Sequence, residues 1–351
     1  VDFVIVNPGA FVELETKFGI VPVATLVKRS GGKTSDRFGG VVFTRADNDS
    51  IRTIEDLRGR SFAAVSPKSF GVIKPLIDAA DVIVLAGYDP IEMRADWINP
   101  WTVGEGGPVV IDLSAEINTH YVHQATYAFV GHVGAGLAAL TDGHSPHATW
   151  PNGEPTKTRA KLSDAFPTDE AWGPAAVIDT ARQVLPRNGV IGVDTGAHRI
   201  LVSQQWQAFG PRQILQSTGL CTMGIALPVA MGHKLAVPET PVIAFTGDAG
   251  LEMILGELAT ARDLKLSVPV VVFVDEQLAL IELKQRGDQL PNLGVDFQGT
   301  DFAAVAEALG GKGVTVRDRT GLQAALEAAL DADTFTLIAC PIGQQPYDGR
   351  F

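Results

Sequence analysis

The sequence predicts an α/β protein made of parallel-sheet, Rossmann-like domains. Short apolar stretches alternate with amphipathic helical stretches along the chain, which is the pattern of strand–helix–strand units. Glycine is abundant, with 37 of the 351 residues, and suits the tight connections of such units. Hydrophobic residues make up 46% and charged residues 19%, which excludes a disordered chain. At about 150 residues per domain, the length predicts two or three domains.

Charge and cysteine content exclude several classes of protein. Lys and Arg total 28 against 40 Asp and Glu, so a net charge of −12 argues against nucleic acid or an anionic membrane surface as the main partner. The longest apolar run, residues 268–274, is far shorter than the ~20 residues that cross a bilayer. Cys221 and Cys340 are too few for a disulfide framework, which favours a reducing compartment.

The first part of the chain, to about residue 140, contains ten predicted strands and helices. We expect strands at 3–6, 21–27, 41–44, 61–65, 81–86 and 108–113, and helices at 11–18, 53–58, 73–80 and 133–140. Residues 141–170 then break the pattern, because they are polar and contain several Pro and Gly residues. This composition predicts a linker.

The most informative part of the sequence follows this linker. We expect a helix at 173–185, a helix at 251–266, and strands at 190–193, 241–246, 268–274 and 336–339. Asp248 follows the strand at 241–246, and Asp275 follows the strand at 268–274. Because a right-handed crossover brings the ends of both parallel strands to one edge of the sheet, Asp248 and Asp275 should lie side by side.

The residue types at Gly247–Gly250 fit an anion–metal site. Gly and Ala carry little or no side chain, so a ligand can approach the backbone closely, and the following amides begin a helix that can face an anion. Carboxylates and phosphate oxygens are the ligands that Mg²⁺ prefers. The segment thus fits a Mg²⁺–diphosphate site, but a plain turn with two solvated carboxylates fits the segment equally well when it is taken alone.

Several motifs in order resemble thiamine-diphosphate (ThDP) enzymes of the acetolactate synthase type. Residues 247–250 and 274–275 resemble the family's Gly-Asp-Gly and Asn-Asn cofactor motif, and 194–199 resemble its Gly-Gln-His loop. Residues 217–224 resemble its Gly-Leu-Gly-Thr-Met-Gly turn. The resemblance covers residues 71–351 and implies a diphosphate-binding domain preceded by a partial central domain.

The resemblance also implies the residues of the site. Mg²⁺ would be held by Asp248, Asp275 and the backbone carbonyl of Gln277, and Met223 would support the bent cofactor. The expected cofactor-binding residues are Gly196, His198, Gly219, Leu220, Met223, Gly247, Asp248, Ala249, Gly250, Asp275, Gln277 and Leu278. Cys221 is expected to be a packing residue rather than a nucleophile.

Two positions depart from the family pattern. Ala249 replaces the second motif glycine, which is a mild change. Val274-Asp275 stands where Asn-Asn is usual, so the second side-chain ligand becomes a carboxylate and the site is more negative than the family's usual site. The added charge could tighten Mg²⁺ binding or weaken diphosphate binding.

The front of the chain resembles a different family. Residues 2–9, 38–45 and 54–66 are similar to periplasmic phosphonate-binding proteins of ABC transporters, in which residues 66–71 would form an oxyanion-binding loop. Only about 70 residues of that fold match, so a scaffold role is expected. We expect the strand at 61–65, a helix at 72–80 and the strand at 81–86 to join the two fragments in one hybrid sheet.

These observations predict four segments: a phosphonate-binding-protein-like fragment (1–71), a partial ThDP-enzyme central domain (72–140), a linker (141–170) and a ThDP diphosphate-binding domain (171–351). The sequence starts with Val1 in a strand-like stretch without a basic leader, so we expect that it begins inside a domain. A cytoplasmic location follows, although the front fragment is of a periplasmic type. Residues 347–351 are expected to be a loose tail.

The expected function is binding of ThDP and Mg²⁺ by an acetolactate synthase-like subunit, a lyase or transferase that acts on small 2-keto acids. In the family, a glutamate from a separate pyrimidine-binding domain starts catalysis, and no segment resembles that domain, so no catalytic residue is assigned. We expect little activity from the chain alone, and a homo-oligomer or a partner chain that supplies the domain. The alternatives are an oxyanion-binding protein that uses the front fragment, or a fusion that only folds.

Overall fold

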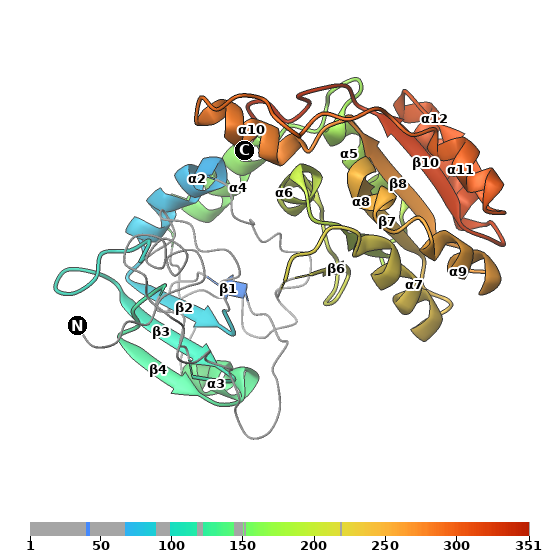
Figure 1. Cartoon of the computed structure of the whole chain (residues 1–351). Helices are drawn as coiled ribbons and strands as arrows, with labels where there is room; N and C mark the ends of the chain where they lie inside the picture. The colour runs from blue at the N-terminus through green and yellow to red at the C-terminus, as the bar shows by residue number, and fades with distance from the viewer. Residues whose placement is uncertain are drawn as a thin grey trace, which may run out of the picture. The chain divides into compact units, whose positions relative to one another are not determined.

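The computed structural model describes residues 67–88, 99–117, 122–143, 150, 152–217 and 220–350, together with one strand at 40–42. The described strands form two sheets, one of four strands and one of six (Figure 1). We call residues 40–42 and 67–143 the four-stranded region, and residues 171–350 the six-stranded region. Each is described by itself.

The four-stranded region has the strand order β1-β2-β3-β4. Strand β1 (Gly40–Val42) pairs antiparallel with β2 (Val82–Ala86). Strands β3 (Val109–Ser114) and β4 (Tyr127–Val130) continue the sheet in parallel. The predicted strands at 81–86 and 108–113 are therefore confirmed to within one or two residues.

Helix α2 (Pro67–Asp78) covers this sheet because Ile73 and Ile77 lie one helical turn apart on its buried face. They form a small core with Ile83, Leu85 and other buried side chains. Helix α3 (Val133–Thr141), predicted at 133–140, has no buried residue. Its first turn is capped by the ring of His132, whose Nδ1 accepts a hydrogen bond from the amide of Ala135 (3.1 Å).

Several expectations for the front of the chain lie outside the described residues. They are the strands at 3–6, 21–27 and 61–65 and the helices at 11–18 and 53–58. The hybrid strand–helix–strand unit over residues 61–86 therefore stays a prediction. The strand expected at 41–44 is present as β1, and its pairing with β2 joins residues from the two halves of the proposed fusion in one sheet.

The segment 141–170 contains a helix that the linker prediction missed. Helix α4 (Glu154–Ala165) begins after Gly153 with proline in its first turn, and it contacts α2. Its sequence is polar and it has no buried residue, so composition alone could not separate it from a loop. Its partly buried Leu162 packs against the small core of the four-stranded region. The position of the domain boundary stays a prediction.

The six-stranded region is a parallel sheet with the order β6-β5-β7-β8-β10-β9. All five strand pairs run parallel, which confirms the predicted fold class. The strands are β5 (Val190–Val193), β6 (Ile214–Gln216), β7 (Val242–Gly247), β8 (Pro269–Val274), β9 (Lys312–Thr315) and β10 (Thr336–Pro341).

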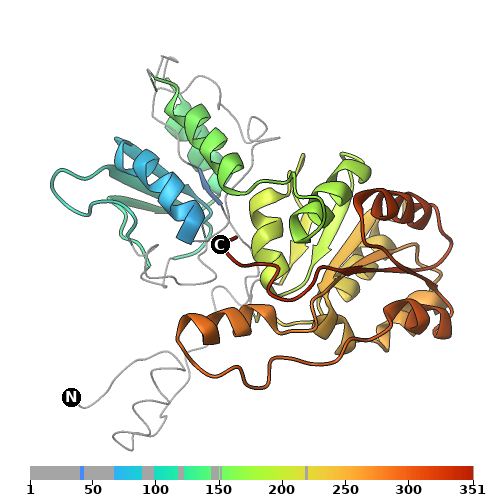
Figure 2. The same ribbon diagram turned by 90° about the horizontal axis from the view of Figure 1, so that it is seen from above.

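Helices cover both faces of this sheet (Figures 1 and 2). One face carries α5 (Pro174–Val184), α6 (Ala197–Gln205) and α12 (Arg319–Leu330). The other face carries α7 (Ala226–Ala236), α8 (Asp248–Glu252), α9 (Glu257–Asp263) and α11 (Phe302–Ala308). Helix α10 (Ala279–Gly287) follows β8.

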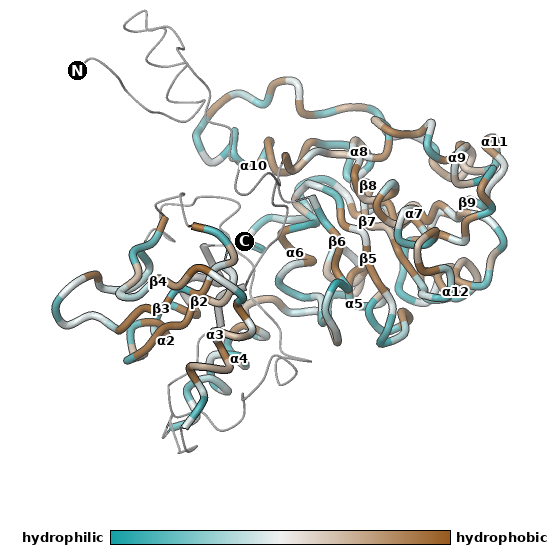
Figure 3. Tube along the Cα trace, turned by 90° about the horizontal axis from the view of Figure 1, so that it is seen from below, coloured by the Kyte–Doolittle hydropathy of each residue, from teal (hydrophilic) through white to brown (hydrophobic). Residues whose placement is uncertain are grey.

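The central strands are apolar throughout because both of their faces are buried. Along β7, Ile243 and Phe245 enter the core on the α5 side, and Val242 and Ala244 enter the core on the α7 side. Strand β8 is buried at all of its positions. In Figure 3 the strands are drawn mostly in the colour of hydrophobic residues. Continuous apolar runs of this kind are typical of parallel sheets between helical layers.

One predicted helix is wrong in its extent. Residues 251–266 do not form one helix, because α8 ends at Glu252 and α9 starts at Glu257. The turn between them uses three-residue spacings, such as Ile254 N to Leu251 O (3.0 Å) and Glu257 N to Ile254 O (2.9 Å). Gly256, which lowers helix propensity, lies in this turn. No helix among the described residues is long and apolar enough to span a membrane.

Candidate functional site

Two carboxylates meet at the carboxyl ends of β7 and β8. These strands are neighbours, with Gly247 opposite Phe273, so the residues that follow them emerge together. Asp248 Oδ2 accepts hydrogen bonds from the amides of Asp275 (3.1 Å) and Glu276 (2.8 Å), and its Oδ1 accepts from the amide of Ala249 (2.8 Å). This confirms the predicted adjacency of Asp248 and Asp275.

Both carboxylates are buried, with exposed fractions of 3% for Asp248 and 7% for Asp275. Burial raises the pKa of Asp248. Burial and the charge of Asp248 together raise the pKa of Asp275 to about 8, although the amide of Gln277 donates to Asp275 Oδ1 (3.2 Å). A divalent cation between them would offset both the loss of hydration and the repulsion between the two charges, so the pair fits Mg²⁺. Because both carboxylates are buried, the alternative of a plain turn with two solvated carboxylates is wrong.

The metal shell cannot be made of side chains alone. Among the described residues, no group of three or more His, Cys, Asp or Glu side chains could hold a metal ion. Two carboxylates would therefore have to be completed by backbone carbonyls, water or the oxygens of a bound diphosphate. Mg²⁺ is commonly held in this way, by one or two carboxylates together with phosphate oxygens.

A third buried carboxylate, Asp194, was missed as a site residue. It follows β5 and is fully buried. Its Oδ1 accepts hydrogen bonds from the amides of Thr195 (2.8 Å) and Ile225 (3.1 Å). Its Oδ2 accepts from the amide of Gly224 (2.9 Å) and the hydroxyl of Thr246 (2.8 Å). The sequence signal was an Asp directly after a buried strand on the same sheet edge.

Gly250 is required for a reason that differs from the expected one. A Cβ at Gly250 would lie 2.5 Å from Asp194 Oδ2 and 3.1 Å from Thr246 Oγ1. The close approach at this glycine is thus made by a carboxylate of the same chain. Gly224, with φ of +85°, is similarly tight, since a Cβ there would lie 2.7 Å from Ile254 Cγ2. Helix α8, together with the turn that follows it, and the 220–225 turn therefore pack directly on each other.

His198 lies beside Gly247 in the first turn of α6. Its ring stacks on Phe273 (centroids 5.2 Å apart, planes at 15°), and a Cβ on Gly247 would lie 3.6 Å from its Cε1. Burial lowers its pKa to about 4, against the opposite effect of Asp194. The neutral ring keeps Nε2 buried, without a hydrogen-bond partner among the described residues. A bound ligand could satisfy this atom.

The remaining expected site residues differ in how deeply they are buried. Gly196 precedes α6 and lies against the His198 ring, which is 2.8 Å from where a Cβ would stand. Met223 is half-buried beside Gly224, whereas Leu220 is 89% exposed. Gly219 lies outside the described residues. Leu278 is the residue before α10, and its amide donates to the carbonyl of Val295 (2.8 Å).

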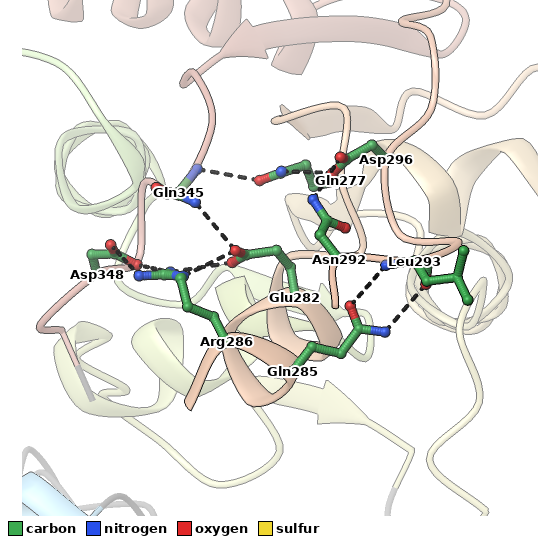
Figure 4. A network of polar contacts seen from close by, with 9 residues as sticks. All are labelled: Gln277, Glu282, Gln285, Arg286, Asn292, Leu293, Asp296, Gln345 and Asp348. Carbon is green, nitrogen blue, oxygen red and sulfur yellow. Dashed lines mark hydrogen bonds and ion pairs between the residues drawn. The ribbon is translucent and has the colours of Figure 1, made fainter. Parts of the chain in front are cut away.

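Gln277 is fixed by a network of polar contacts (Figure 4). Its Nε2 donates to Asp296 Oδ1 (2.7 Å), and its Oε1 accepts from the amide of Gln345 (3.3 Å). The side chain of Gln345 donates to Glu282 Oε1 (3.1 Å), and Arg286 bridges Glu282 and Asp348. The network joins Gln277, two residues after Asp275, to α10 and to the C-terminal segment.

The C-terminal residues are not a loose tail, at least as far as Arg350. Tyr347 is 3% exposed and belongs to the core on the α5 side of the sheet. Arg350 forms an ion pair with Glu170. Burial raises the pKa of the Tyr347 phenol, and the nearby charges of Asp275 and Asp248 add to this rise. The tail prediction failed because a single aromatic residue carries the packing, and a lone aromatic gives no periodic signal.

Comparison with known proteins supports both resemblances. Residues 194–340 match the family model of the thiamine pyrophosphate enzyme C-terminal TPP-binding domain. Residues 1–77 match the model of the ABC transporter phosphonate periplasmic substrate-binding protein. The first match begins directly after β5 and reaches Cys340 in β10, and it includes Asp194, Asp248 and Asp275.

Relatives of known function agree with the first match. A catabolic acetolactate synthase from Raoultella terrigena is 29% identical over 276 residues, covering 76% of this chain and 48% of that protein. The acetolactate synthase isozyme 1 large subunit of Escherichia coli is 34% identical over 168 residues, covering 46% of this chain and 29% of that protein. The chain thus spans at most about half the length of these relatives.

A solved structure shows the same fold. The ThDP-dependent 4-hydroxybenzoylformate decarboxylase of Rhodococcus jostii RHA1 aligns with a TM-score of 0.61 and 20% identity, over 78% of this chain and 50% of that one. Together these findings confirm that the chain resembles ThDP enzymes of the acetolactate synthase type, with a front segment similar to phosphonate-binding proteins.

Proposed function

We propose that the six-stranded region binds ThDP together with Mg²⁺, as part of an acetolactate synthase-like enzyme that acts on small 2-keto acids. The observation that carries the proposal is the pair of buried carboxylates at neighbouring strand ends, Asp248 and Asp275. Keeping two such groups buried and both charged is unfavourable unless a cation lies between them. The match of residues 194–340 to a TPP-binding domain supports ThDP as the cofactor that would bring this cation.

Each part of the site has a distinct task in this proposal. Asp248, Asp275 and the carbonyl of Gln277 would hold Mg²⁺, which in turn would hold the diphosphate. His198 would donate or accept a hydrogen bond through Nε2, its buried atom without a partner. Met223 and Leu220, from the 220–225 turn, would contact the thiazolium side of the cofactor, and burial of Leu220 would remove an exposed apolar side chain from water.

The chain's own residues bind and orient the cofactor in this account, whereas the cofactor itself supplies the carbanion chemistry next to a keto group. No catalytic base is assigned among the described residues. We therefore propose that the pyrimidine-binding domain is supplied by another segment or another chain, in a homo-oligomer or with a partner. Vigorous decarboxylation of 2-keto acids by the purified 351-residue chain would contradict this dependence.

The direct test is calorimetric titration with ThDP and Mg²⁺ of the wild type, D248A and D263A. Wild type should bind only when both ligands are present, because Mg²⁺ links the diphosphate to the protein. Asp248→Ala removes a direct metal ligand, so its affinity should fall by about 100-fold or more. Asp263 is exposed and pairs with Arg262, so D263A is the matched control and should bind normally. Normal binding by D248A would refute the proposed site.

A second candidate function follows from the match of residues 1–77 to a phosphonate-binding family. It predicts binding of a phosphonate or another oxyanion, without any need for Mg²⁺. The same calorimeter separates the two candidates, because a phosphonate such as methylphosphonate should give heat only under the second one. Binding of both ligands by one chain would show that the two segments function independently.

A further inference from the structure

We propose that Asp194 is the positioning residue of the cofactor site, and that it holds three loops in register without contacting the cofactor. The inference rests on the proposed function, since it assigns the residue that shapes that same site. Asp194 acts through hydrogen bonds to Thr195, Gly224, Ile225 and Thr246.

These four contacts fix three different segments. Thr195 leads into Gly196 and His198, at the start of α6. Gly224 and Ile225 end the turn that contains Met223 and lead into α7. Thr246 is the residue before Gly247 and Asp248. One carboxylate therefore links three of the four segments that carry the expected cofactor-binding residues.

A further contact is steric rather than polar. The space beside Gly250, where a Cβ would lie 2.5 Å from Asp194 Oδ2, is filled by this carboxylate. Gly250 O in turn lies 3.4 Å from where a Cβ on Gly224 would stand. The segments around Gly224 and Gly250 thus close on each other around Asp194, and a displacement of the carboxylate would move both. Geometry of this kind determines how precisely the ligands of a metal site are oriented.

Only a carboxylate suits this position. Its two oxygens offer about four lone-pair sites and no donor, and four donors point at them. An amide at the same place would keep one accepting oxygen and would turn an NH₂ group toward the amide of Gly224 or Ile225. Asp194→Asn therefore leaves buried donors without acceptors while it changes almost no volume, which loosens these loops selectively.

The test compares wild type, D194N, T246V and T336V. Thr246 donates to Asp194, whereas Thr336 is an equally buried threonine at the opposite, amino-terminal end of β10, so the two Thr→Val changes form a matched pair. One readout is ThDP–Mg²⁺ affinity by calorimetry. The other is amide hydrogen exchange at Gly224 and Ile225 in the protein without cofactor, compared with amides in β8.

We expect D194N to weaken ThDP–Mg²⁺ binding by about 10- to 100-fold, the range typical for residues that orient metal ligands. Exchange at Gly224 and Ile225 should rise while exchange in β8 stays unchanged. T246V should shift both readouts in the same direction by a smaller factor, and T336V should shift neither.

The outcomes are separable. Wild type that does not bind ThDP overturns the proposed function and this inference with it. Wild type that binds, with D194N equal to it in affinity and exchange, overturns the inference alone. If D194N does not fold, T246V decides, because T246V indistinguishable from T336V would also overturn the inference. A uniform rise in exchange across β8 in both D194N and T246V would show a general structural role and equally contradict positioning.

Discussion

The two sheets differ in how completely they are buried. In the six-stranded region, β8 is buried at all positions and β7 at all but its last. In the four-stranded region, β4 is exposed at all four positions and α3 has no buried residue. Tyr127, Phe129 and Val130 of β4 are each more than half exposed. The six-stranded sheet has a hydrophobic core on each face, whereas the four-stranded sheet ends in an exposed apolar edge strand, β4.

Because of this difference, the six-stranded region can hold a preformed site, whereas the four-stranded region needs further contacts to bury its apolar edge. A site needs its side chains held by rigid packing, and Asp194, Asp248 and Asp275 all follow strands of the well-buried sheet. In the described part of the other region the hydrophobic core is a smaller cluster around Ile73, Ile77 and Leu85. We therefore expect the two regions to respond unequally to equivalent substitutions.

The largest contrast should come from phenylalanine truncation. Phe245 is fully buried in β7, and Phe129 is 55% exposed in β4. F245A should lower the free energy of unfolding by about 3–5 kcal/mol, because it removes apolar contacts and leaves a cavity. F129A should change it by less than about 0.5 kcal/mol, as is usual for exposed positions. Urea unfolding followed by circular dichroism measures both, and a similar loss in the two variants would contradict the comparison.

A smaller effect is expected from pH, through His198. Its pKa in the folded protein is lowered to about 4 by burial, from a usual 6.5, so folding favours the neutral ring. The contribution of the neutral His198 ring to the free energy of unfolding is fully present above pH 6.5, and it is lost as the pH falls from 6.5 to 4. Wild type should lose roughly 3 kcal/mol of unfolding free energy in that window through this group. H198Q lacks the titrating ring, so the difference in pH dependence between the two proteins isolates it. Parallel pH curves would refute the assignment.

The smallest effects should come from ion pairs. Arg319 and Asp179 join α12 to α5 with side chains only 30% and 23% exposed, and Arg319 also donates to the carbonyl of Glu170. Lys74 and Asp78 lie on the surface of α2, with 37% and 50% exposed. Double-mutant cycles should give a coupling of about 1 kcal/mol for the first pair and at most about 0.5 kcal/mol for the second. An equal coupling energy for both pairs would contradict the expectation that the more buried pair is coupled more strongly.

The sequence predicted those parts of the molecule that have a periodic or positional signal. Strands such as β7 and β8 are continuous apolar runs, and parallel topology alone placed Asp248 beside Asp275. Helix α4 was missed because its residues are polar, and its place depends on a tertiary contact with α2. The break between α8 and α9 lies where Ile254 comes close to Gly224, a residue 30 positions earlier in the chain.

The site itself could be predicted only in part, for the same reason. Motif residues such as His198 and Gly250 were found, but their physical roles were not. Gly250 accommodates the Asp194 carboxylate, and the position of Asp194 directly after a strand does not by itself reveal which loops it holds. Tyr347 lies more than 70 positions after Asp275, yet it is within electrostatic reach of its carboxylate. Such long-range contacts arise from the fold and not from neighbouring residues in sequence.

The central claim is that a divalent cation lies between Asp248 and Asp275. Mn²⁺, which shares the oxygen ligands of Mg²⁺ and scatters X-rays anomalously, reports this position directly in crystals grown with Mn²⁺ and ThDP. The account predicts one anomalous peak within about 2.5 Å of a carboxylate oxygen from each of these residues. A peak elsewhere, or no peak with ThDP clearly bound, would contradict it.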